Sequence, residues 1–435
     1  MVVTVIIIFV IGYLLIALEH PIKVNKAATA IITGVICWTV YAVMDADSIE
    51  HIGEQRGEHL TEIAAILFFL MGAMTIVELI DAYHGFSIIT DRITTRNPKT
   101  LLWVICWVTF FLSALLDNLT TAIVMVSLTR KLVPDKNMRL FFCGMIVIGA
   151  NAGGAWSPIG DVTTTMLWIG GQISSTNIIK TLLLPSIVCM AVPLLYLQFT
   201  LKGELGRDEK KTTTDHDHKK TKIPGSTLML IVGVCGLISV PVFKTLTHLP
   251  PYLGMLLALG VIWVISEIIN PDMDEAEKKP YTATHALTRI DISSILFFLG
   301  ILLAVGCLQS MGVLSNFAGY LDKTIGDNRI IIILIGILSA IVDNVPLVAA
   351  SMGMYSLETY HMDHMIWEFL AYCAGTGGSM LIIGSAAGVA VMGMEKIDFI
   401  WYLKRISLLA MLGYFAGAIV YLIIYPYLAV HPPVN

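Results

Sequence analysis

The sequence predicts an all-helical polytopic membrane protein made of two related halves of opposite orientation, and three observations predict it. Hydrophobic residues make up 56% of the 435 positions and charged residues only 14%, with a mean hydropathy of +0.80. Uncharged stretches long enough to cross a hydrocarbon core of about 30 Å recur along the whole chain. Three sequence blocks of the first half also recur, in the same order, in the second half. A water-soluble globule of this size would need more surface charge.

The internal repeat consists of three collinear pairs of blocks, separated by 229, 226 and 224 residues. The pairs are 62–70 with 291–299, 112–124 with 338–350, and 150–162 with 374–386. Chance similarity between apolar helices would scatter these separations, so their near constancy indicates duplication. The expected domains are a first inverted repeat (1–202), a charged cytoplasmic linker (203–224) and a second inverted repeat (225–435).

Eight apolar stretches have the length of ordinary membrane spans. They lie near 3–18, 27–44, 61–82, 178–201, 226–243, 252–269, 291–312 and 406–427. The first stretch has no basic segment before it and no small-residue cleavage site after it, so we expect a retained span and not a signal peptide.

The remaining apolar stretches are irregular. The run 100–129 is too short for two crossings, yet Asp117 and Asn118 interrupt it midway, so we predict a re-entrant helical hairpin. The run 140–179 is too long for one straight helix, and its central glycines and Pro158 predict two half-helices. Irregular backbone at membrane depth is tolerated only where protein or a water-filled cavity satisfies its polar groups, so these breaks mark a site.

Each half then makes five crossings, an odd number that inverts the second half. With both termini in the periplasm, all but five of the 27 lysines and arginines lie on the cytoplasmic side. The exceptions are Arg56, Lys180, Lys244, Lys323 and Arg329. We therefore expect a multi-pass protein of a bacterial inner membrane. The small net charge of −5 suggests no nucleic-acid partner.

The two Asp-Asn pairs and the two broken spans are expected to meet near the membrane midplane, where transporters with inverted repeats bind their substrates. Aspartates at this depth are unfavourable unless they are paired or bind an ion. Candidate residues for ion binding and proton coupling are Asp117, Asn118, Thr120, Thr121, Asn151, Ser157, Asp161, Thr163, Asp343, Asn344, Ser379 and Ser385. A hard cation such as sodium prefers oxygen ligands, and we expect it at Asp117, Asn118, Asp343 and Asn344.

The same carboxylates can carry protons, because burial raises the pKa of a carboxylate and a nearby cation lowers it. Competition between sodium and protons at one alternating site is sufficient for exchange. Two simpler interpretations stay open. Each Asp-Asn pair can serve only to cap the half-helix that follows it, and the threonines can bond back to helix carbonyls.

A second group of charged residues lies near span ends. Glu78, Asp81 and His84 are candidate accessory or pH-sensing residues, since an unperturbed histidine titrates near neutral pH. Glu19 and Lys26 also lie near a span end. For all five, the default expectation is a solvated side chain that reaches water by snorkelling.

Six segments together resemble one known family. They are 18–30, 68–86, 116–125, 149–168, 342–350 and 375–393. Across essentially the whole chain, the sequence resembles NhaD-type sodium/proton antiporters of the ion-transporter superfamily, which includes arsenite permeases and dicarboxylate carriers. The resemblance implies proton uptake in exchange for cytoplasmic sodium or lithium, with the Asp-Asn and SPIGD residues in the ion path. It also implies a homodimer and transported ions in place of any cofactor.

Two other functions stay open. An anion carrier for arsenite or a dicarboxylate would share this architecture, but it should present neutral or basic groups at the hairpin tips, where helix N-termini already favour anions. A channel would not need duplicated hairpins and broken spans. The sequence contains no nucleotide-binding loop, so we expect a secondary active transporter and not an enzyme.

Overall fold

The computed structural model describes residues 1–44, 49–90, 92–93, 95, 97–200, 225–269, 274 and 278–428, and the predicted linker over 203–224 lies outside them. All regular structure in the described ranges is helical, as the sequence predicts. Eight of these helices are long and apolar enough to cross a membrane. They include every predicted ordinary span except the first, whose helix α1 (Val2–Ala17) is shorter, and they add α8 (Lys136–Ala155).

The helices follow one another in the same pattern in each half. The first half contains, besides α1 and α8, α2 (Glu19–Ile22), α3 (Lys26–Met44), α4 (Ile49–Ala82), α5 (Ser87–Thr90), α6 (Pro98–Ser113), α7 (Asn118–Leu132), α9 (Val162–Ile169) and α10 (Ser175–Thr200). The second half contains α11 (Ser226–Thr247), α12 (Pro251–Ile268), η2 (Lys279–Tyr281), α14 (Ala283–Arg289), α15 (Ile292–Ser310), α16 (Val313–Thr324), α17 (Asn328–Leu338), α18 (Asn344–Met354), α19 (Met365–Gly377), α20 (Ala386–Glu395), α21 (Phe399–Arg405) and α22 (Ser407–Leu428).

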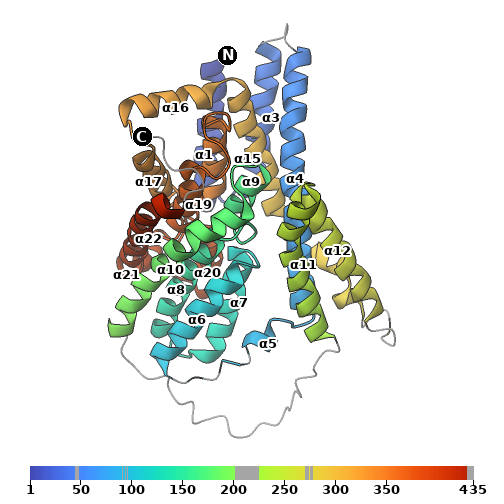
Figure 1. The fold of residues 1–435 in the computed structure, drawn as a ribbon, viewed down its shortest axis with the longest axis vertical. Coiled ribbons are helices and arrows are strands. Elements are labelled where there is room, and N and C mark those ends of the chain that lie inside the picture. Colours follow the sequence, from blue (N-terminus) through green and yellow to red (C-terminus); the bar gives the residue numbers. More distant parts are fainter. Residues whose placement is uncertain are drawn as a thin grey trace.

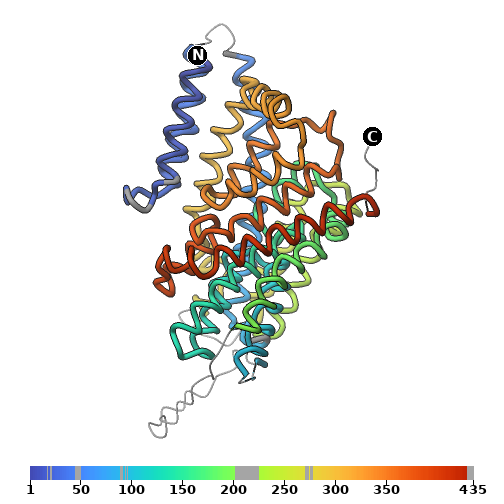
Figure 2. Tube along the Cα trace, turned by 90° about the vertical axis from the view of Figure 1, so that its left-hand side faces the viewer, coloured from blue at the N-terminus to red at the C-terminus, as the bar shows by residue number. Residues whose placement is uncertain are grey.

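The two halves interleave in space. Helix α3 packs along α15, α4 along α12, and α10 along α22, so each pair joins one helix from each half. Figure 1 shows α3, α4 and α15 together in the upper part of the molecule. In Figure 2, α22 (red) crosses the molecule obliquely beside α10 (green). Each half therefore completes the packing of the other.

The helices break where the sequence predicts. Helix α6 is followed by α7 after a short connection, α8 by α9, α17 by α18, and α19 by α20. The residue before each second helix caps it, because its side chain accepts a hydrogen bond from a main-chain N–H of the first turn. These four caps are Asp117, Asp161, Asp343 and Ser385.

Matching hydrogen bonds join the broken spans to the hairpins in both halves. The hydroxyl of Ser113 donates to the carbonyl of Ala150 at 2.6 Å. The hydroxyl of Ser339 donates to the carbonyl of Ala374 at 2.8 Å. These residues correspond to one another in the predicted repeat, so the bonds support the duplication. The repeat boundaries and the re-entry of the hairpins stay predictions.

Matching close approaches of glycine to backbone accompany these bonds. A Cβ added to Gly153 would lie 2.2 Å from the carbonyl oxygen of Phe110, and one added to Gly377 would lie 2.0 Å from that of Gly336. Both distances are far inside van der Waals contact. In both halves, glycine therefore lets the hairpin and the broken span approach backbone to backbone.

A buried ionic cluster that the sequence analysis did not anticipate ties the ends of three helices together. Glu395, which ends α20, is 5% exposed. One of its oxygens accepts from Nε of Arg139 at 2.9 Å, and the other accepts from Arg130. Because both arginines belong to the first half, this cluster connects the two halves through charge as well as packing.

Gly153→Ala and Gly377→Ala should each destabilise the protein, because the added methyl groups collide with backbone and not with a side chain that can move. Overpacking of this kind costs about 1–3 kcal/mol or more, and thermal unfolding of the detergent-purified variants measures it. Gly260→Ala in α12 is the matched control, since no atom lies within 4 Å of its added Cβ. Unchanged melting of the first two variants would contradict this packing.

Candidate ion-binding site

The side-chain amide of Asn151 in α8 lies at the centre of a buried polar network. Its Oδ1 accepts from Nδ2 of Asn118 at 3.1 Å, and its Nδ2 donates to the hydroxyls of Ser379 at 2.9 Å and Ser385 at 3.0 Å. All four side chains are buried. Because an amide both accepts and donates, one residue connects the first hairpin with the second broken span.

Asp161 is the most buried of the three predicted aspartates, with 2% exposure. Its Oδ1 accepts from both the main-chain N–H and the hydroxyl of Thr163 at 2.9 Å, and its Oδ2 accepts from Nδ2 of Asn118 at 2.9 Å. Asp161 also precedes the N-terminus of α9, where the helix dipole stabilises negative charge. The carboxylate is thus held by neutral donors alone within the described part of the chain.

Asp117 occupies the corresponding position at the start of α7. It accepts from the N–H of Thr120 at 2.8 Å and from the hydroxyl of Thr120 at 2.6 Å. Asp117 and Asn118 line a cavity of about 80 Å³, which also borders Thr165 and Ser294. At roughly 30 Å³ per water molecule, the cavity has room for a partly hydrated ion.

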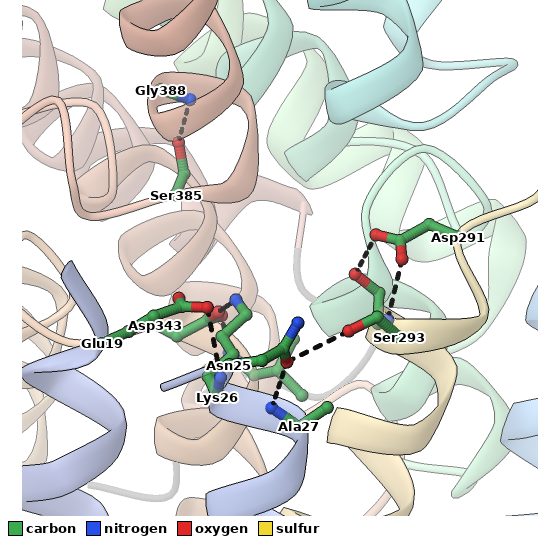
Figure 3. A network of polar contacts seen from close by, with 11 residues as sticks. Glu19, Asn25, Lys26, Ala27, Asp291, Ser293, Asp343, Ser385 and Gly388 are labelled. Carbon is green, nitrogen blue, oxygen red and sulfur yellow. Dashed lines mark hydrogen bonds and ion pairs between the residues drawn. The ribbon is translucent and has the colours of Figure 1, made fainter. Parts of the chain in front are cut away.

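Asp343 at the start of α18 is held differently. Its cap bond from the N–H of Val345 is long, at 3.4 Å, and Pro346 stands where the first half has Thr120, so both the N–H and the hydroxyl donor are absent. Its Oδ2 accepts instead from Nζ of Lys26 at 2.9 Å (Figure 3). The default expectation of a solvated Lys26 is therefore corrected: its side chain turns inward to a predicted site residue.

The three aspartates form one electrostatic group. Asp117 and Asp343 both lie close enough to Asp161 to interact with it electrostatically. Three like charges at short range are unfavourable unless cations or protons compensate them. The arrangement therefore favours binding of positive charge.

The other predicted site residues differ in what their side chains do. The hydroxyl of Thr121 is buried and has no hydrogen-bond partner among the described residues, and Asn344 is buried beside Asp343. These two polar groups are candidates to bind an ion. Ser157, in contrast, donates to the carbonyl of Ala114 at 2.5 Å and so ties the broken span to the hairpin connection.

The predicted accessory residues lie at the C-terminal end of α4, and no printed bond joins them to the network around Asp161. Glu78 pairs with Arg289 of α14 at 2.8 Å. Asp81 accepts, through its main-chain carbonyl, from the N–H of His84 at 2.7 Å. His84 is exposed and has a left-handed backbone, with φ of 54°. A pH-sensing role for this group stays a prediction.

Sequence reasoning missed one further buried acid. Glu368 in α19 is fully buried and accepts from the amide of Asn177 and, at 3.1 Å, from the hydroxyl of Tyr421. A glutamate inside the apolar run 365–377 is a visible signal in the sequence. Its donors come from α10 and α22, so it holds these two helices against α19.

A hollow of about 850 Å³ lies next to the small cavity. It is lined by Phe68 of α4 and Met166 of α9, whose sequence neighbours Phe69 and Thr165 line the small cavity. Its wall also includes Glu62, near the end of α4 that is predicted to face the periplasm. The two spaces together form a candidate route from one side of the molecule to the aspartates.

Comparison with known proteins places this architecture in a family. A family model described as "Citrate transporter" matches residues 6–368. The chain is 51% identical to "Sodium/proton antiporter 1" of Arabidopsis thaliana over 97% of its length and 71% of the relative. It is 47% identical to "Sodium/proton antiporter 2" of the same plant, over 96% and 98%.

A bacterial relative extends the comparison. The chain is 30% identical to "Na(+)/H(+) antiporter NhaD" of Vibrio cholerae, over 96% of this chain and 90% of the relative. The matches span the hairpins and broken spans of both halves. The chain is thus a multi-pass membrane transporter that belongs to the citrate-transporter family, together with relatives named NhaD and sodium/proton antiporter.

Proposed function

We propose that this protein exports cytoplasmic sodium, and lithium in its place, in exchange for protons by alternating access. The observation that carries the proposal is the group of three aspartates, which lie within electrostatic range of Asp161 at the breaks of discontinuous helices. Alternating access is favoured because substrate sites of such folds lie between repeats. The relatives named sodium/proton antiporters support the same assignment.

The charge of the site favours a cation over the citrate in the family's name. A polyanion brought to Asp117, Asp161 and Asp343 would meet like charges at several contacts. The basic residue in printed contact with these aspartates, Lys26, is already paired with Asp343. Sodium, in contrast, prefers the carboxylate, amide and hydroxyl oxygens present there.

Sodium and protons neutralise the same carboxylates, so exchange follows from competition. A bound cation favours the charged form of a carboxylate, and burial favours its protonated form. An ion arriving from the cytoplasm therefore releases protons, and protons arriving from the other side release the ion. The hollow beside the small cavity supports access from the side predicted to be periplasmic.

The cellular setting completes the proposal. The distribution of lysine and arginine supports a bacterial inner membrane with both chain termini in the periplasm. Relatives from a plant as well as bacteria share this sequence, so the membrane type rests on that charge distribution. We further propose a homodimer, as the resemblance implies.

Everted membrane vesicles from cells that produce the protein should show sodium/proton exchange. After respiration establishes a pH gradient, addition of sodium or lithium should collapse it, because internal protons leave as the cation enters. Fluorescence of a pH-sensitive dye measures the change, and vesicles without the protein are the control. Collapse by citrate, succinate or arsenite, but not by sodium, would identify an anion carrier.

Asp117→Asn, Asp161→Asn and Asp343→Asn, made singly, should each lower exchange about tenfold or more, because each removes a charge that neutralises the ion. Asparagine is as good an N-cap as aspartate, so these substitutions keep the capping function and remove only the charge.

The matched control is Asp398→Asn, since Asp398 caps α21 by accepting from the N–H of Trp401 at 2.9 Å, away from the site. Initial rates of sodium-dependent fluorescence recovery measure all four variants. Full exchange by the three site variants would show that their aspartates serve only as helix caps.

A further inference from the structure

We propose that Lys26 is a tethered cation that occupies the place of the transported ion at Asp343 when the carrier is empty, and that incoming sodium must displace it. The inference rests on the proposed function and adds a residue that sets ion affinity. It would make Lys26 a competitor of sodium within the protein itself.

The geometry separates Asp343 from the other two aspartates. Nζ of Lys26 lies 2.9 Å from Oδ2 of Asp343 and 4.4 Å from the centre of the Phe297 ring. Asp117 and Asp161 accept only from neutral donors in the described part of the chain. One carboxylate of the three is thus already bound to a cation, in the position that an ion ligand would use.

The local sequence explains why Asp343 needs this partner. In the first half, Thr120 satisfies both oxygens of Asp117. Pro346 at the matching position offers no donor, and the remaining bond from Val345 is 3.4 Å long. Asp343 is therefore the aspartate with the weakest bonds from its own helix. Its charge depends on a cation from elsewhere.

Helix stability does not account for the lysine. Lys26 is the first residue of α3, where the helix dipole disfavours positive charge. The pair is also not sealed: the side chains of Lys26 and Asp343 are 25% and 18% exposed. A partly exposed ion pair of this kind contributes little net stability and opens readily.

Nearby acids give the displaced ammonium another place to stay. Glu19 accepts from the main-chain N–H of Lys26 at 3.1 Å, and both Glu19 and Asp291 lie within electrostatic range of its side chain. Figure 3 shows Glu19, Lys26 and Asp343 together, with Asp291 on the neighbouring helix. Sodium can therefore replace the ammonium at Asp343 while Lys26 stays among carboxylates.

Sodium kinetics in proteoliposomes that contain the full-length protein test this role. Lys26→Gln and Lys26→Met should lower the apparent KM for sodium about tenfold, which corresponds to the loss of about 1.4 kcal/mol of competition. Lys26→Arg keeps the charge and should keep the wild-type KM. In the Asp343→Asn background, Lys26→Gln should leave KM unchanged, because Lys26 acts through Asp343.

A measurement on the wild-type protein covers variants that fail to fold. An amine-reactive reagent should modify Lys26 faster as sodium increases, with a midpoint near the KM, whereas exposed Lys99 should react at a constant rate. Mass spectrometry quantifies both lysines. Greater sodium affinity without Lys26, or sodium-dependent labelling of Lys26, supports the inference.

Other results overturn it in distinguishable ways. If KM is unchanged or higher in Lys26→Gln and Lys26→Met while the maximal rate falls, Lys26 is a structural tie only. If sodium leaves the labelling of Lys26 unchanged in an active carrier, the ammonium is not displaced. If the wild-type protein exchanges no sodium at all, the proposed function fails and the inference falls with it.

Discussion

Backbone released by four helix breaks must be satisfied inside the protein, and the amide of Asn151 is where that requirement is met across both halves. It accepts from Asn118 of the first hairpin and donates to Ser379 and Ser385 of the second broken span. A hydroxyl or carboxylate in its place could not make all three bonds with the same polarity. The positions of the capping residues, and therefore of the aspartates, depend on this one side chain.

The capping interpretation and the ion-binding interpretation of the aspartates are compatible. Every break has a cap, but Ser385 shows that an uncharged cap is sufficient at one of them. Burial of Asp161 at 2% exposure is expensive for a residue whose capping function serine or asparagine could perform. The negative charge therefore needs a reason beyond helix initiation, and the electrostatic proximity of the three carboxylates provides one.

Much of the fold follows from the sequence because lipid imposes simple rules on length and composition. The ordinary spans agree closely with helices such as α3, α15 and α22, and the breaks at Asp117 and Asp161 fall where glycine, proline and polar residues predict them. The partners could not be predicted the same way. The contact of Lys26 with Asp343 joins residues 317 positions apart, and the cluster around Glu395 depends on how α20 meets α7 and α8, which no local pattern specifies.

The interleaving of α3 with α15, α4 with α12 and α10 with α22 has a consequence for how the chain acquires its structure. A segment made of the first half alone would expose to lipid the glycine-lined and polar surfaces that the second half covers. The junction of the duplication is thus a boundary in ancestry and not in thermodynamics. Assembly of the native state has to wait for the last helix to leave the ribosome, and the earlier spans must remain loosely associated until then.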